Sequence, residues 1–287
     1  MRGNPVRESN NPVLRSLPKT QSGYAQFGNA AAGYGAQQVM GQQPYAYPQQ
    51  GEVSRPLTID DVVAKTGLTL AVLSVAAVIS YFLSSSSPAL MGPLTMVGAI
   101  GGLALVLVAT FGRKQDSPAL VLSYAVLEGL FLGAASFMFA NLVSTGGPAM
   151  IFQAVIGTIG VFVGMLVTYK VGNVRVTPKF QRIMVACLFG VVFAALANLV
   201  LGMFGVNGGA GLGLRDGHGH LGMAVGFSLL CIGLAAMSFI VDFDAADQMI
   251  RAGVPAKAAW GIALGLTVTL VWLYIEILRL LSYFNND

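Results

Sequence analysis

Residues 118–143 read PALVLSYAVLEGLFLGAASFMFANLV, an apolar run with a single charged side chain, Glu128. About 20 apolar residues form a helix long enough to cross the roughly 30 Å of hydrocarbon in a bilayer. A charged group near the centre of such a helix costs about 3 kcal/mol on insertion scales, so it usually faces a bundle interior or a water-filled cavity. The run therefore predicts a transmembrane helix that turns a carboxylate away from lipid.

Six other runs have the same character, and Pro and Gly cluster between them, where helices are expected to end. The seven predicted spans are residues 62–83, 88–112, 118–143, 149–171, 183–204, 221–241 and 258–284. The chain of 287 residues is 55% hydrophobic and only 10% charged, whereas soluble domains carry about 25% charged residues. We therefore predict an all-α, polytopic integral membrane protein with seven transmembrane helices.

Residues 1–57 differ from the rest in composition. Within them, residues 23–50 are rich in Gly, Ala, Gln, Tyr and Pro, and such a segment buries too little apolar surface to offset the entropy lost on ordering. We predict a disordered polar tail at residues 1–57, serving as a tether or as a docking segment, and a seven-helix transmembrane domain at residues 58–287. The first apolar run is too long for the core of a cleavable signal peptide, so it is expected to remain as an anchor.

Basic residues between the spans predict the orientation of the chain. They follow the second, fourth and sixth spans, as Arg113, Lys114, Lys170, Arg175, Lys179, Arg182, Arg251 and Lys257. The segments after the first, third and fifth spans have no Lys or Arg except Arg215, which lies beside Asp216. Because basic segments stay on the cytoplasmic side, we expect a protein of the cell membrane with a cytoplasmic N-terminus and an extracytoplasmic C-terminus.

The sequence lacks the motifs of common enzyme classes. It has no HExxH zinc motif, no phosphate-binding P-loop and no G-x-S-x-G nucleophile motif, so neither enzymatic activity nor a cofactor is expected. His218 and His220 supply too few ligands for zinc, and no metal centre is predicted. The net charge is +4, and the basic residues lie mainly between the apolar runs and in the segment before the first one, where they would set topology. Membrane lipid is thus the expected partner, and nucleic acid is not.

Carboxylates inside the spans are the candidate functional residues. Glu128 lies near the middle of the third span, where it is either a hydrogen-bonded structural group or part of an ion pathway. Asp242 and Asp244 end the sixth span, and residues two apart on a helix are separated by about 200° of rotation, so they cannot share a face. Asp242 lies on the face of Ser238, which could look into the bundle. Asp244 instead begins a polar stripe suited to an aqueous exit or a solvated helix end.

Glu276 and Arg279 lie one helical turn apart in the last span. They can pair, which neutralises much of the cost of placing them in a membrane. Arg279 is also near enough to the outer end of its helix to extend its charged group toward the interface. Glu276 is therefore a candidate for ion pathway or proton sensing, with a purely structural ion pair as the alternative.

Several stretches together resemble one family. The segment YAVLEGLFLG at residues 124–133 resembles the Glu-Gly-Leu-x-Leu-Gly signature of the Bax inhibitor-1 proteins, also called the transmembrane BAX inhibitor motif family. The segments IVDFD at 240–244 and WLYIEILRLL at 272–281 resemble the same family. NPVLRSL at 11–17 is similar to the start of its bacterial branch with long polar tails.

The resemblance implies a seven-helix fold with the last helix central, and a pH-sensitive leak of cations, chiefly calcium, in a bacterial inner membrane. In that family an Asp at the end of helix six and an Asp in helix seven form a proton-sensing pair. Matching the pattern places the first at Asp244, whereas the helical-face argument favours Asp242. The second falls at Thr269, which is not an acid, or at Glu276, and Glu128 is a further candidate.

The resemblance also leaves a second reading of function open. Some bacterial relatives are associated with regulation, so the chain could be a non-conducting membrane scaffold that binds another membrane protein, such as a membrane protease. The conducting protein would have calcium or another cation as its partner. The scaffold would instead depend on its tail and on exposed helix faces.

Overall fold

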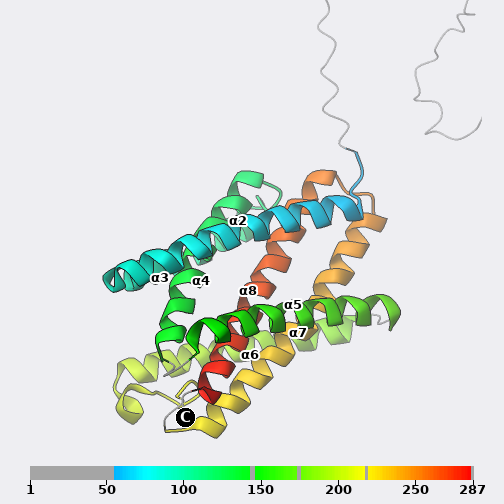
Figure 1. Ribbon diagram of the computed structural model, residues 1–287. Helices are drawn as coiled ribbons and strands as arrows, with labels where there is room; N and C mark the ends of the chain where they lie inside the picture. The colour runs from blue at the N-terminus through cyan, green and yellow to red at the C-terminus, as the bar shows by residue number, and fades with distance from the viewer. Residues whose placement is uncertain (1–54, 143–145, 173–175, 217–218, 286–287) are drawn as a thin grey trace, which may run out of the picture. The chain divides into compact units, whose positions relative to one another are not determined.

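The computed structural model describes residues 55–142, 146–172, 176–216 and 219–285. These residues form long helices joined by short segments (Figure 1). The long helices are α2 Ile59–Ser86, α3 Met91–Phe111, α4 Pro118–Leu142, α5 Gly147–Val171, α6 Pro178–Met203, α7 Leu221–Arg251 and α8 Ala259–Phe284. Three short 3-10 helices lie between them, η1 Pro88–Leu90, η2 Val206–Gly209 and η3 Ala256–Ala258.

All seven long helices are long and apolar enough to cross a membrane, which confirms the all-α, seven-span prediction. Two predicted ends are wrong by five residues or more. The sequence predicted a break from residue 245, but α7 continues to Arg251, because helix-compatible residues and an ion pair of 2.8 Å between Asp247 and Arg251 extend it. The first strong breaker beyond is Gly253, whose φ of 64° leaves the helix. At the other end, α6 begins at Pro178 rather than at residue 183.

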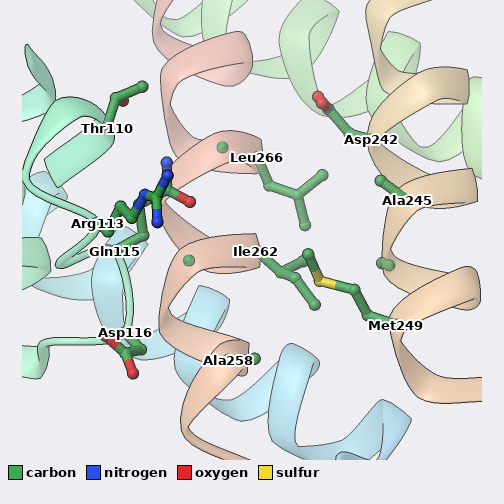
Figure 2. A pocket seen from close by; sticks show the side chains of 13 residues that line it. Thr110, Arg113, Gln115, Asp116, Asp242, Ala245, Met249, Ala258, Ile262 and Leu266 are labelled. Atoms are coloured by element: carbon green, nitrogen blue, oxygen red, sulfur yellow. The ribbon is translucent and has the colours of Figure 1, made fainter. Parts of the chain in front are cut away.

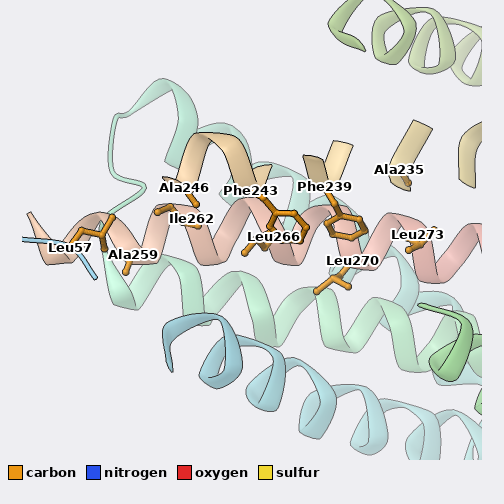
Figure 3. Packing of buried hydrophobic residues seen from close by; sticks show 10 residues of the cluster. All are labelled: Leu57, Ala235, Phe239, Phe243, Ala246, Ala259, Ile262, Leu266, Leu270 and Leu273. Carbon is orange, nitrogen blue, oxygen red and sulfur yellow. The ribbon is translucent and has the colours of Figure 1, made fainter. Parts of the chain in front are cut away.

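The centre of the bundle is α8. Two thirds of its apolar stretch is buried within the chain (67%), whereas only 6% of that of α6 is buried. It packs against α2, α4, α5 and α7. Figure 3 shows Phe239 and Phe243 of α7 lying over Leu266 and Leu270 of α8, within the largest cluster of buried apolar side chains. The position of the last helix agrees with the resemblance.

Small residues bring α4 close to two neighbours. A Cβ at Gly133 would overlap the carbonyl oxygen of Ala77 on α2, and one at Gly98 of α3 would lie 2.5 Å from the backbone nitrogen of Phe131. Neither position has room for a side chain, so these helices pack backbone to backbone, as small residues allow in membranes. Gly129 of α4 likewise leaves no room against the Leu73 carbonyl oxygen of α2, whereas Gly160 and Gly164 on α5 have open space around them.

A short segment before α2 is fastened to the turn between α7 and α8. The Leu57 amide donates to the Val254 carbonyl at 2.8 Å, and the Ala256 amide donates to the Arg55 carbonyl at 3.0 Å. Leu57 is buried in the central cluster. Residues 55–57, which the sequence analysis grouped with the tail, thus lie against the bundle; residues 1–54 lie outside the described residues.

The start of α2 is capped by its own sequence. The Thr58 hydroxyl accepts from the Asp61 amide at 3.3 Å, and the Asp61 carboxylate accepts from the Thr58 amide at 3.1 Å, which forms a capping box. Arg55 donates two hydrogen bonds to the same carboxylate, at 2.8 and 2.5 Å. The cap therefore also anchors the segment that runs to the α7–α8 turn.

Candidate functional site

Asp242 lies where α7 faces α8. Its Oδ2 accepts a hydrogen bond of 2.8 Å from the Thr269 hydroxyl. The helical-face argument expected Asp242 to look into the bundle, and this contact places it there. Thr269 is also the position at which one alignment put the second acid of the family pair. In this chain a carboxylate therefore meets a neutral hydroxyl across the α7–α8 contact.

A cavity of about 450 Å³ lies next to Asp242, in the half of the bundle that contains the start of α8. Its walls come from the end of α3 and the segment after it, from α7 and from the first half of α8. Figure 2 shows Asp242 and Met249 on α7 at one side and Arg113 and Asp116 at the other, with Leu266 of α8 between them. The cavity connects the α7–α8 contact with the segment between α3 and α4.

An ion pair ties two walls of this cavity together. Lys257, next to the start of α8, lies 3.0 Å from the Asp116 carboxylate. The hydrogen bond from Lys257 lowers the pKa of Asp116 below its ordinary value of 3.8. Both side chains are well exposed, so this pair contributes little to stability. It does fix the segment between α3 and α4 beside the last helix.

Asp244 lies apart from the cavity lining. Its Oδ2 accepts from the Gln248 side-chain amide at 2.6 Å. The next turn holds the pair of Asp247 and Arg251, so the polar stripe expected from the sequence is present along the end of α7. Tyr169 of α5 is within electrostatic range of Asp244. This environment is that of a polar helix end.

Glu128 lies between α3 and α4. Its Oε2 occupies the space that a side chain at Gly102 would take. Glu128 is also within electrostatic range of Tyr124, one turn earlier on α4. The glycine on α3 therefore makes room for the carboxylate between the two helices. Glu128 is not part of the cavity wall that contains Asp242.

Glu276 is buried among arginines. It is 1% exposed, its Oε2 lies 2.8 Å from Arg279, and its Oε1 lies 3.3 Å from Arg215. The ion pair predicted between Glu276 and Arg279 is confirmed. Arg279 is itself only 13% exposed and lies 5.9 Å from the centre of the Phe139 ring, so its charged group stays inside the bundle rather than extending to the interface.

Sequence reasoning missed Arg215. It comes from the segment between α6 and α7, and it lies 61 positions before its partner Glu276. Burial lowers the pKa of Arg215, nearby Arg279 lowers it further, and Glu276 opposes both effects. A signal was present in the sequence, because Arg215 is the exception among segments that otherwise lack basic residues. A basic residue in a segment where the orientation predicts none can instead form an ion pair inside the bundle, as Arg215 does with Glu276.

The four candidate carboxylates thus fall in separate places. Thr269 and Glu276 are seven residues apart on α8, about 10 Å along the helix axis. Glu276 faces cations and Asp242 faces Thr269, so these two acids do not form the proton-sensing pair of the resemblance. Within the described part of the chain, no three side chains of His, Cys, Asp or Glu come together as a metal site. His218 lies outside the described residues.

Comparison with known proteins agrees with this architecture. No curated protein matches the sequence significantly. A family model described as Bax inhibitor 1 like matches residues 11–286. The match covers every helix described above and all the candidate carboxylates. The chain therefore belongs to the Bax inhibitor 1 like family.

Proposed function

We propose that this protein passes cations, chiefly calcium, across a membrane, and that protonation of Asp242 controls the passage. The observation that carries the proposal is the carboxylate of Asp242 at the α7–α8 contact, beside a cavity of about 450 Å³. An acid placed within an apolar span usually serves an ion or proton pathway, since burial there is otherwise unfavourable. The pH-sensitive cation leak that the family resemblance implies would need a titratable acid at such a site.

The Thr269 hydroxyl is a suitable partner for an acid that gains and loses a proton. Its O–H group donates to Asp242 when the carboxylate is charged, and a hydroxyl oxygen can equally accept a hydrogen bond from a neutral carboxyl. Proton binding therefore changes the charge in the cavity wall and reverses the direction of the hydrogen bond, without leaving either group unpaired. We propose that this reversal shifts the balance between closed and conducting arrangements of α7 and α8.

The proposed orientation places the cavity on the cytoplasmic side. The segments after α3 and α7 carry Arg113, Lys114 and Lys257, and basic segments stay in the cytoplasm. In this arrangement, the N-terminus is cytoplasmic and the C-terminus extracytoplasmic, in the inner membrane of a bacterium. A cation would meet Asp116 at the cavity wall and then Asp242 deeper in the bundle.

The other acids take different roles in this proposal. Glu128 is a second intramembrane group that could carry a proton or an ion between α3 and α4. Asp244 belongs to a polar helix end, and Glu276 holds arginines inside the bundle. The protein acts by permitting passage, so we propose no enzymatic reaction and no cofactor.

Calcium flux into liposomes across a pH series tests the proposal. The unaltered protein should conduct with a rate that changes with pH, whereas Asp242→Asn should give a rate that is nearly independent of pH. Asp244→Asn is the matched control, because it removes a carboxylate two positions away whose hydrogen bond is to Gln248. It should keep the unaltered pH profile. An unchanged profile in Asp242→Asn, or no flux from any version, contradicts the proposal.

The second candidate function is that of a regulator that binds another membrane protein. One observation favours it: α6 has a single buried residue, Met184, so most of its apolar surface is open to a partner. A regulator would show no calcium flux in liposomes. Its binding to a co-purified membrane protein would fall on polar substitution of Phe189 and Phe193, which are both exposed on α6.

A further inference from the structure

The segment at residues 204–216 is folded onto the end of α6. The Asn198 side-chain oxygen accepts hydrogen bonds from the amides of Leu212 at 2.9 Å and Leu214 at 3.3 Å. Asn207 donates to the Gly211 carbonyl at 2.7 Å, and Gly211 has the φ of 62° that glycine adopts readily. These bonds are internal to α6 and the segment, so the two form one structural unit.

This unit touches the rest of the bundle sparingly. Asp216 accepts hydrogen bonds from Gly219 and His220 just before α7, and Arg215 makes the polar contacts with α8. Among the long helices, α6 contacts chiefly α7. Its one buried residue is Met184. Arg215 reaches Glu276 at 3.3 Å and lies 5.7 Å from the centre of the Phe227 ring. Its carbonyl accepts a weak hydrogen bond of 3.4 Å from the Tyr283 hydroxyl. Among the described residues, the polar attachment of the unit to α8 is thus made at Arg215.

We infer that Arg215 is a latch that fastens residues 204–216, and α6 with them, onto α8 at the end opposite the cavity. When Arg215 withdraws, the unit lifts from the bundle and uncovers the buried groups around Glu276. This inference concerns the attachment of a helix and does not depend on ion passage.

The geometry explains how the latch can open. Glu276 has a second and closer partner, Arg279, at 2.8 Å on its own helix, so the departure of Arg215 does not leave a buried carboxylate without a cation. Arg215 and Arg279 also repel each other, because both carry a positive charge beside the same acid. The Arg215 side chain is 33% exposed, so it already borders solvent. The latch is therefore the longer of two ion pairs that share one carboxylate.

A native cysteine reports on the latch. The chain has two cysteines, Cys187 and Cys231. Cys187 is exposed on α6, whereas Cys231 of α7 is fully buried and lies within electrostatic range of Glu276, Arg215 and Arg279. Replacing Cys187 by Ala leaves one thiol, whose exposure follows the opening of this end of the bundle.

The test is the rate at which a water-soluble maleimide labels Cys231 in the full chain held in lipid nanodiscs, where both faces are open to reagent. In the Cys187→Ala background, Arg215→Gln should label at least about tenfold faster, the change that corresponds to losing a charge-assisted hydrogen bond. Arg215→Lys keeps the charge but cannot offer a forked donor, so it should label at an intermediate rate. Lys114→Gln is the matched control, because it removes an exposed cation at the other end, and it should label at the unaltered rate.

A second reporter separates local opening from general loosening. Ala235 is fully buried in the central cluster of α7 and α8. A chain with Ala235→Cys, Cys187→Ala and Cys231→Ala should remain slow to label when Arg215→Gln is added. Equal acceleration of both reporters, or an unaltered Cys231 rate in Arg215→Gln, overturns the inference. If Arg215→Gln fails to fold, Arg215→Lys decides alone, and an unaltered rate there has the same consequence.

Discussion

The two halves of α8 treat a buried carboxylate in opposite ways. In the first half, Asp242 meets the neutral hydroxyl of Thr269 beside a cavity. In the second half, Glu276 is enclosed by two guanidinium groups, from Arg279 and Arg215. Both acids lie inside apolar spans, so composition alone does not distinguish them. Their partners do.

The difference lies in what a change of charge would do to the partners of each acid. The Glu276 carboxylate supplies the counter-charge of two arginines, so removing it would leave buried cations unpaired. A carboxylate that faces a hydroxyl can gain or lose a proton while its hydrogen bond persists in one direction or the other. This contrast supports the proposal that protons act in the half with the cavity, whereas the ion pairs of the opposite half hold helices together.

The largest expected effect is at the end with the arginines. Glu276→Gln removes the counter-charge of Arg279 and Arg215, so the free energy of unfolding in detergent should fall by about 3–5 kcal/mol. Thermal unfolding followed by circular dichroism measures this loss. The double variant Glu276→Leu with Arg279→Met should lose less free energy of unfolding than Glu276→Gln, since Arg215 can then turn to solvent. A loss under 1 kcal/mol (roughly the value of an exposed pair) would remove the contrast between the two ends.

An intermediate effect is expected at the end with the cavity. Thr269→Val removes the donor to Asp242 and should reduce the free energy of unfolding by about 1–3 kcal/mol at neutral pH. Thr267→Val is the matched control on the same helix, because the Thr267 hydroxyl donates to the Ala263 carbonyl one turn earlier, within α8 itself. Its effect should be close to zero. Equal losses in the two variants would show that the Asp242 contact adds no stability.

The smallest effect is expected at the cavity wall. Asp116→Asn removes the ion pair with Lys257 and should lower the free energy of unfolding by at most about 1 kcal/mol at neutral pH, since both side chains are exposed. The folded state lowers the pKa of Asp116, so its contribution is present above the ordinary pKa of 3.8 and is lost as the pH falls through the folded value. Melting curves of the two proteins should therefore converge below pH 3.8. A difference that grows in acid contradicts the assignment.

Much of the fold follows from features that lie close together in the sequence. Apolar runs and the Pro and Gly between them predicted the seven spans, and the helical faces of Asp242 and Asp244 predicted which of them looks into the bundle. The spacing of Glu276 and Arg279 predicted their ion pair. These predictions depend on residues within a few turns of one another, where helical geometry alone fixes the relation.

The remaining features depend on contacts between distant segments. The partner of Asp242 lies 27 positions away, and that of Glu276 in the segment before α7 lies 61 positions away. Spacing along one helix cannot specify such pairs, because they depend on how helices rotate and shift against each other. The overrun of α7 to Arg251 had a local cause, in that Gly253 and not Asp244 is the breaker. The end of α7 could have been predicted by treating Gly253, rather than the charged residues before it, as the residue that ends the helix.

The backbone pairing between Arg55–Leu57 and the α7–α8 turn has a mechanical consequence. Two amide hydrogen bonds and a buried leucine clamp this turn to the start of α2. The end of α7 and the start of α8, the helices that carry Asp242 and Thr269, are consequently held together at the turn between them. Any relative swing of α8 must grow with distance from that junction, so a small tilt there becomes the largest displacement at the tip of α8.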